Sequence, residues 1–238
     1  MAHLLPSGGQ LAVALEIGPK RRVFTQVCDW VGWCRAGKDE DAALQALFAA
    51  GPRYAQVAER AGVALTLPAS LEALVVVERV SGTAVTDFGA LSVLLAKDAE
   101  PLDDAQIARL ERLLLACWAT LDDALKAVPT DQHDQKPAHG RAPNALYHHV
   151  LEADMLHLAA FGPAAKPPAL ASMDVLFEQG ARVREQFIAH LRAVPRGQTF
   201  EPRRRQGFAW TPRFAVRRAA WHALDHAWEL QARQSNPA

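Results

Sequence analysis

The sequence predicts two parts of different fold class: an α+β N-terminal module with the order strand–strand–helix–strand, followed by an all-α four-helix bundle. Near the N-terminus apolar residues alternate with a period of two, whereas after residue 101 they recur at helical spacing. The chain has 238 residues, 50% of them hydrophobic, so each part has enough apolar surface to bury a core. We place the module at residues 1–98 and the bundle at residues 99–238.

The first part contains three predicted strands and one predicted helix. Residues 11–17 alternate between large apolar and small or polar side chains, which is typical of a half-buried strand. A Gly-Pro turn leads into a second strand near residues 22–28. A helix is expected over residues 39–62, broken or kinked at its internal Gly-Pro pair because proline has no amide donor. The β-branched run at residues 74–80 predicts the third strand.

Four amphipathic helices are expected in the second part, and each is introduced by a capping side chain or by a proline in its first turn. In chain order these start signals are Asp103 or Asp104, Pro143, Ser172, and Thr211 with Pro212. Four such helices joined by long connections are typical of an antiparallel bundle.

Composition restricts the class of function. The formal net charge is zero, so no overall field attracts nucleic acid or a membrane surface. No stretch approaches 18 consecutive apolar residues, and the N-terminus lacks the pattern of a signal peptide. Three cysteines without a regular spacing indicate reduced thiols. We therefore expect a cytoplasmic protein whose partner is a small molecule, with no nucleic acid and no membrane involved.

Three histidines form the strongest candidate site. His222 and His226 lie four residues apart on the last predicted helix, so both imidazoles leave one face. His149 falls on the apolar stripe of the second helix of the bundle. Buried imidazoles without partners are costly, and a divalent metal would remove that cost while leaving coordination positions open. Zinc, nickel and iron all suit three imidazole ligands.

Several neighbours of these histidines leave alternatives open. His148 would replace His149 as a ligand if the helix phase were shifted by one residue. Glu152, beside His149, is a candidate general base, a fourth ligand or an acceptor of a hydrogen bond from a ligand histidine, and a surface role is equally compatible. Arg217 and Arg218 belong to six arginines within sixteen residues that contain no acid. They predict either an anion-binding rim or a solvated loop and helix start.

The second part resembles the DinB-like family, which consists of four-helix bundles. The resemblance covers roughly residues 103–233 and is carried by His149 within Tyr-His-His-Val-Leu-Glu-Ala and by the His222 and His226 pair within Arg-Arg-Ala-Ala-Trp-His-Ala-Leu-Asp-His. It implies a divalent metal site and frequent homodimerisation. In some members it also implies thiol-dependent S-transferase or isomerase activity with a low-molecular-weight thiol.

The first part resembles HicB-like α+β modules over about residues 11–80. The matching pattern is strand, turn, strand, then Asp-Trp-Val-Gly-Trp-Cys at residues 29–34, with Lys-Asp-Glu-Asp-Ala-Ala-Leu at residues 38–44 opening the helix. HicB proteins bind a toxin and often add a DNA-binding segment. No such segment is recognisable here, so the resemblance implies the small fold rather than the antitoxin function.

Two functions from different classes follow from this sequence. The first is a DinB-like divalent-metal-binding protein acting as a thiol-linked transferase or hydrolase, with Glu152 as a proton acceptor and the arginines as an anion rim. The second is a non-catalytic binding or regulatory protein whose HicB-like module supplies the interaction surface. A nucleic-acid-binding role ranks last because the net charge is zero and no recognition-helix motif is present.

Overall fold

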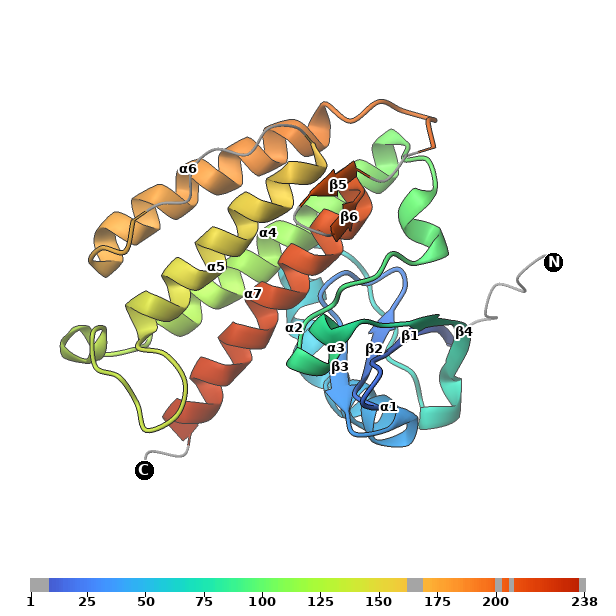
Figure 1. Cartoon of the computed structure of the whole chain (residues 1–238), viewed down its shortest axis with the longest axis horizontal. Coiled ribbons are helices and arrows are strands. Elements are labelled where there is room, and N and C mark those ends of the chain that lie inside the picture. Colours follow the sequence, from blue (N-terminus) through green and yellow to red (C-terminus); the bar gives the residue numbers. More distant parts are fainter. Residues whose placement is uncertain (1–8, 162–168, 200–202, 206–207, 236–238) are drawn as a thin grey trace.

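The computed structural model describes residues 9–161, 169–199, 203–205 and 208–235. Within them the fold is mixed α+β, with a four-stranded sheet in the N-terminal part and long helices in the remainder. Figure 1 shows the sheet and its short helices on one side of the molecule and the long helices on the other. The predicted change from a strand-containing part to a helical part is therefore confirmed. Among the described residues, no helix is both long and apolar enough to cross a membrane.

The sheet consists of β1 (Leu11–Ile17), β2 (Val23–Val27), β3 (Cys34–Gly37) and β4 (Leu74–Ser81). Its strand order is β3-β2-β1-β4, in which β1 pairs antiparallel with β2 and parallel with β4. The predicted strands match β1, β2 and β4. Strand β3 was not predicted because its four residues, Cys-Arg-Ala-Gly, contain no β-branched or aromatic side chain.

Strand β1 is more deeply buried than its alternating sequence predicts. Four consecutive residues from Val13 to Glu16 are buried, so the expectation of a half-buried strand was wrong. The second face is covered by the segment after β4, where Thr86 and Ser92 donate hydrogen bonds to the Glu16 carboxylate. A polar side chain in an alternating pattern can therefore face protein when its hydrogen-bond partners come from a distant segment.

The predicted helix at residues 39–62 is two helices, α1 (Glu40–Ala49) and α2 (Gly51–Arg60). Asp39 caps α1 by accepting a hydrogen bond from the Ala42 amide at 2.8 Å. Pro52 lies in the first turn of α2, where its missing amide donor does no harm. The predicted break at the Gly-Pro pair is confirmed. Helix α1 packs on β2 and β3, and α2 packs on the first long helix.

The long helices are α4 (Asp104–Lys126), α5 (Pro143–His157), α6 (Met173–Arg192) and α7 (Pro212–Ser235). Helix α4 packs on α6 and α7, and α5 packs on the same two helices. Helix α7 also faces the sheet side, so it is buried around most of its circumference. The shorter elements are α3 (Ala84–Phe88), β5 (Arg203–Arg205), β6 (Phe208–Trp210) and the 3-10 turns Leu71–Ala73, η2 (Ala96–Ala99), Thr130–Gln132 and Leu158–Ala160.

Most of the predicted helix starts are observed. Asp103 forms a capping box with Gln106 at the start of α4, and Pro143 opens α5. The Thr211 hydroxyl accepts a hydrogen bond from the Phe214 amide at 3.3 Å at the start of α7. Ser172 lies at the N-cap of α6, but its side chain makes no capping hydrogen bond. The predicted end of the second helix at residues 162–163 lies outside the described residues.

The two parts share one continuous hydrophobic core, which includes Val13 and Trp33 from the sheet side and Leu224 from α7. The two parts approach each other closely at Gly32, whose φ of +91° favours glycine. A Cβ atom there would lie 2.9 Å from Leu224 Cδ1 and 3.3 Å from the Ala220 carbonyl oxygen. The predicted boundary between residues 98 and 99 falls within η2. The tight packing brings side chains of the N-terminal part next to those of α7.

Candidate metal centre

Three histidines from two helices converge, as predicted. His222 Nε2 lies 3.2 Å from His149 Nε2 and 3.1 Å from His226 Nε2. One ligand nitrogen from each of the three residues lies within 4.8 Å of the other two. His149 is supplied by α5, whereas His222 and His226 stand one turn apart on α7. The spacing on α7 therefore produces a site only because α5 packs against that face.

The distances suit coordination of one cation. With metal–nitrogen bonds of about 2.0–2.1 Å, two ligands of a tetrahedral ion lie about 3.3 Å apart. Both measured contacts of His222 are close to this value. Hydrogen bonds alone explain the cluster less well, because His222 Nε2 approaches two other ring nitrogens and carries at most one proton. A cation would satisfy all three lone pairs at once.

Glu229 orients one of the three rings. Its Oε2 atom lies 2.7 Å from His226 Nδ1, and its other oxygen pairs with Arg233. When Nδ1 donates to a carboxylate, Nε2 keeps its lone pair and can serve as a ligand. Glu229 was not singled out from the sequence, although its position three residues after His226 was an available signal.

Burial keeps two of the rings neutral. Burial lowers the pKa of His149 from 6.5 to about 4, and Arg141 and the neighbouring imidazoles act in the same direction. The pKa of His222 is lowered well below 6.5, again mainly by burial and then by His226 and His149. Neutral imidazole is the form that binds metal, so both rings are ready to bind without losing a proton. His222 Nδ1 is buried and has no hydrogen-bond partner among the described residues.

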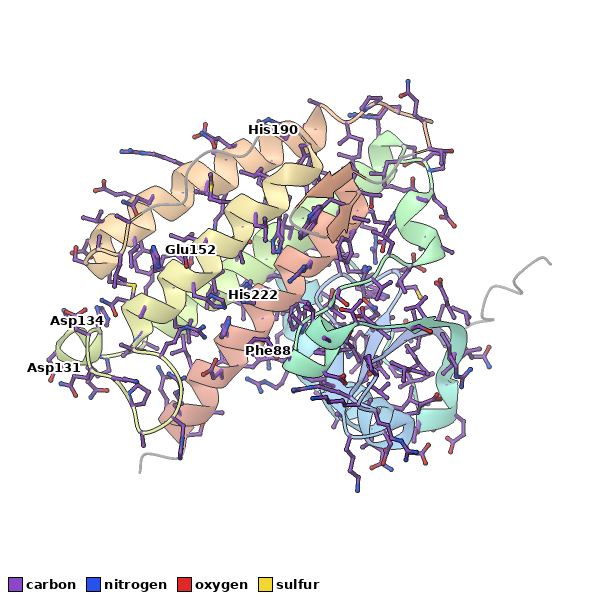
Figure 2. The ribbon with its side chains drawn as sticks, in the orientation of Figure 1. Phe88, Asp131, Asp134, Glu152, His190 and His222 are labelled. Atoms are coloured by element: carbon purple, nitrogen blue, oxygen red, sulfur yellow. The ribbon has the colours of Figure 1, made fainter. Side chains whose placement is uncertain are left out.

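The cluster opens into a cavity of about 510 Å³. Helices α5 and α7 form one side of this cavity, and α3 from the N-terminal part forms another. Figure 2 shows Phe88 at the edge of α3 that faces the long helices, with His222 on α7 and Glu152 on α5. The Phe88 side chain is 90% exposed, although phenylalanine is normally buried. The side chains that line the cavity are those of Val85, Phe88, Ala90, Arg141, His149, Glu152, Ala153, Leu156, His157, Arg218, Trp221, His222, Asp225 and His226.

The α3 wall is anchored to the sheet by the buried Glu16. Its carboxylate accepts hydrogen bonds from Thr86 Oγ1 at 2.6 Å and from the Ser92 amide at 2.9 Å. The Thr83 side chain caps α3, and the Lys20 amide donates to Asp87 at 2.8 Å. These contacts hold the short helix in place despite its length of five residues. The N-terminal part is thereby a structural component of the histidine cavity.

The structure also places the alternative ligand His148. Its Nδ1 atom lies 3.6 Å from Glu152 Oε2, and His148 is not in the group of three converging histidines. His149, and not His148, therefore occupies the candidate ligand position. Glu152 lines the cavity and is exposed. Its predicted role as a proton acceptor is compatible with this place and stays a prediction.

The two arginines of the predicted anion rim point to different cavities. Arg218 lines the histidine cavity, and its guanidinium lies 5.3 Å from the centre of the Trp210 ring. Arg217 is buried and forms an ion pair with Asp98, with Nη2 2.5 Å from Oδ2. The one-residue step along α7 separates the two side chains by about 100°. Of the two arginines, only Arg218 lies where an anion near the histidines would meet it.

His157 is a further cavity residue. From the sequence alone, a place at the edge of the apolar stripe of this helix and a place at the surface are equally compatible with it. It is 1% exposed, and its Nδ1 atom lies 3.5 Å from an oxygen of the buried Asp154. Its ring packs against Trp210, with centroids 5.4 Å apart. Burial lowers its pKa, so the ring is neutral near pH 7. The signal was its spacing of eight residues from His149, which places both residues near one face of α5.

No protein-family model matches this chain, and no curated protein is significantly similar to it in sequence. The resemblances to DinB-like and HicB-like proteins therefore rest on the quoted residues. The class defined by the fold and site is an α+β protein with a three-histidine cluster that could hold a metal ion.

Proposed function

We propose that this protein binds one divalent metal through His149, His222 and His226, and that its four long helices form a DinB-like bundle. Zinc, nickel and iron remain the candidate metals, since three imidazoles suit each of them. The observation that carries the proposal is the convergence of three ring nitrogens at the wall of a 510 Å³ cavity. A site with three protein ligands that adjoins a cavity retains room for water or substrate.

The cavity supports a metal-dependent reaction on a small molecule. A bound divalent ion would lower the pKa of a coordinated water or thiol, so that a nucleophile forms at neutral pH. Arg141 and Arg218 would bind an anionic group of the substrate, and Glu152 would accept a proton. Val85 and Phe88 would contact its apolar part. We therefore favour a thiol-linked transferase or hydrolase, with a low-molecular-weight thiol as one reactant.

The decisive experiment measures metal content by mass spectrometry in protein purified without an affinity tag. We expect about one equivalent of metal in the wild type and almost none in the double variant H222A/H226A. H148A is the matched control, because His148 is adjacent to His149 but outside the group. It should retain its metal. Absence of metal from the wild type after reconstitution with zinc, nickel and iron would overturn the proposal.

A second function is a non-catalytic binding or regulatory protein with a structural metal. The observation in its favour is the 90% exposed Phe88, which offers an apolar contact to a partner protein. Removal of the metal separates the two functions. In an enzyme, stripping the metal abolishes turnover of thiol and ester substrates, and adding it back restores turnover. In the binding protein, no such reactivity exists with or without the metal.

A further inference from the structure

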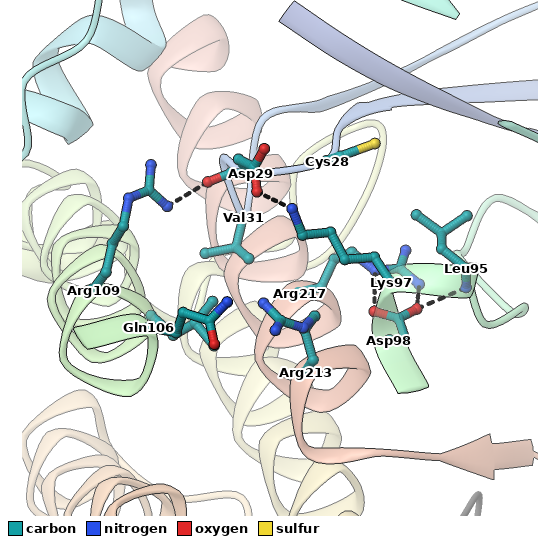
Figure 3. Close-up of a pocket in the computed structure, with 11 residues that line it drawn as sticks. Cys28, Asp29, Val31, Leu95, Lys97, Asp98, Gln106, Arg109, Arg213 and Arg217 are labelled. Atoms are coloured by element: carbon teal, nitrogen blue, oxygen red, sulfur yellow. Dashed lines mark hydrogen bonds and ion pairs between the residues drawn. The ribbon is translucent and has the colours of Figure 1, made fainter. Parts of the chain in front are cut away.

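A second cavity lies between the two parts of the chain, away from the three histidines. Its volume is about 190 Å³, and it is bounded by the turn after β2, by η2, and by α4 and α7. Figure 3 shows side chains from these four segments directed toward one space. The lining residues are Cys28, Asp29, Val31, Leu95, Lys97, Asp98, Gln106, Arg109, Leu110, Arg213 and Arg217. None of them lines the histidine cavity.

The lining of this second cavity carries more positive than negative charge. Four of its side chains are cationic, and only Asp29 and Asp98 are acidic. Asp98 forms an ion pair with Arg217, which contacts both of its carboxylate oxygens. The Asp29 carboxylate forms an ion pair with Lys97. Two guanidinium groups, those of Arg109 and Arg213, therefore line the cavity without a carboxylate in hydrogen-bond contact among the described residues.

Arg213 is the least satisfied of these groups. The residue is 7% exposed, and its Nε atom is buried without a hydrogen-bond partner among the described residues. Within the described part of the chain, its one hydrogen bond is long, 3.4 Å from Nη2 to the Pro101 carbonyl oxygen. Figure 3 shows the guanidinium of Arg213 extending into the space near Gln106 and Lys97. A buried cationic donor without a partner is costly, and an anion would supply that partner.

The pKa directions agree with this difference between the arginines. Burial acts to lower the pKa of Arg217, but Asp98 outweighs it and the net shift is upward. For Arg213 burial is again the largest effect, and nearby carboxylates such as Asp98 and Glu100 do not compensate it, so its pKa is lowered. Burial also lowers the pKa of Arg109. Arg217 thus has a carboxylate in direct contact, whereas Arg109 and Arg213 have none among the residues that the structure describes.

We propose that this cavity is a binding site for a phosphate group, held by Arg213 and Arg109 with Lys97 and Gln106 at its edge. The lining carries four cationic and two acidic side chains, and this excess of two positive charges matches the charge of a phosphate dianion. The planar guanidinium group also matches the geometry of an oxyanion. Gln106 accepts from the Asp103 amide through Oε1, which leaves its side-chain NH₂ as a donor. The site is independent of the metal centre, because no residue is shared between them.

The test is titration calorimetry of phosphate in a buffer without other oxyanions, at constant ionic strength set with chloride. The probes are inorganic phosphate, sulfate, phenyl phosphate and acetate. We expect binding of phosphate and sulfate, and at least tenfold weaker binding of acetate, which has one charge. Tight binding of phenyl phosphate would identify the group as part of an organic phosphate, and its exclusion would identify free phosphate.

Variants assign the binding to this cavity. R213M, which changes a residue of α7, should weaken phosphate binding at least tenfold. K97M, which changes a residue of η2, should weaken it to a smaller degree. The matched control is R182M, because Arg182 is exposed on α6 and lies outside the cavity. The H222A/H226A protein should bind phosphate like the wild type, which separates this site from phosphate held by a metal. Equal binding by R213M, K97M and R182M, or no phosphate binding by the wild type, would overturn the proposal.

Discussion

The histidine cavity and the cavity lined by Arg213 obtain their polar side chains in different ways. In the histidine cavity, two of the three candidate ligands and a carboxylate beside them lie on one helix, because His222, His226 and Glu229 share one face of α7, and His149 comes from α5. In the cavity lined by Arg213, the contacting residues are far apart in the sequence, since Arg217 pairs with Asp98 and Arg109 donates a hydrogen bond to the Asp29 carbonyl oxygen. The comparison shows that candidate metal ligands at helical spacing can be recognised in the sequence. Ion pairs between remote segments cannot, because they depend on how those segments pack.

The largest expected effect is on stability, at the Arg217–Asp98 pair. Both side chains are almost fully buried, at 5% and 1% exposed. R217M leaves the Asp98 carboxylate buried without its cation, which typically costs about 3–5 kcal/mol. Urea denaturation measures the free energy of unfolding. The double variant R217M/D98N should recover part of this loss, and a double variant as unstable as R217M would show that charge pairing is not the cause.

Next in size is the effect of Glu229 on metal affinity. E229Q removes the carboxylate that orients His226, and loss of a hydrogen-bond partner of a ligand histidine typically lowers metal affinity by about 10–100-fold. Competition with a chromogenic chelator measures the change. D225N is the control, because Asp225 lies on the same helix but pairs with Arg35. If E229Q and D225N bind metal equally well, the orienting role of Glu229 is wrong.

The buried imidazoles of the histidine cavity should make the stability of the protein depend on pH. His149 and His222 have lowered pKa values in the folded protein, so below pH 6.5 the unfolded chain binds more protons than the folded one. The metal-free protein should therefore lose stability as the pH falls from 6.5 to about 4, the pKa of folded His149. Thermal unfolding across this range in the wild type and in H149Q checks it. H149Q should show a shallower slope, and an identical slope would contradict the assignment.

The smallest expected effect on stability is at Phe88. Since this side chain is 90% exposed, F88A should change the free energy of unfolding by no more than about 0.5 kcal/mol. The same change should weaken binding of a substrate that contacts α3, as measured by KM once a substrate is known. T86V provides the contrast, because Thr86 is buried and bonded to Glu16. It should destabilise the protein by about 1–3 kcal/mol, since it leaves part of the Glu16 carboxylate without a donor.

The accuracy of the sequence predictions varied with the range of the interaction. Strands β1, β2 and β4, the Gly-Pro break and the capping of α4 by Asp103 all depend on neighbours within a few residues, and all were predictable. Strand β3 was missed because pairing with β2, and not its own composition, makes it a strand. The burial of Glu16 was missed for the same reason, and the sequence left the burial of His157 open: each residue is covered by a segment remote in the sequence.

The sequence by itself determined the division into a strand-containing part and a helical part, most of the helix starts, and the three histidines of the candidate metal site. These features have a period of two or of 3.6 residues, or a spacing of four, and so are visible without knowledge of packing. Tertiary structure alone decided that α3 forms a wall of the histidine cavity and that Arg217 and Arg218 face different sites. Sequence spacing indicates which side chains share a face of a helix, but only the packing of remote segments decides what lies against that face.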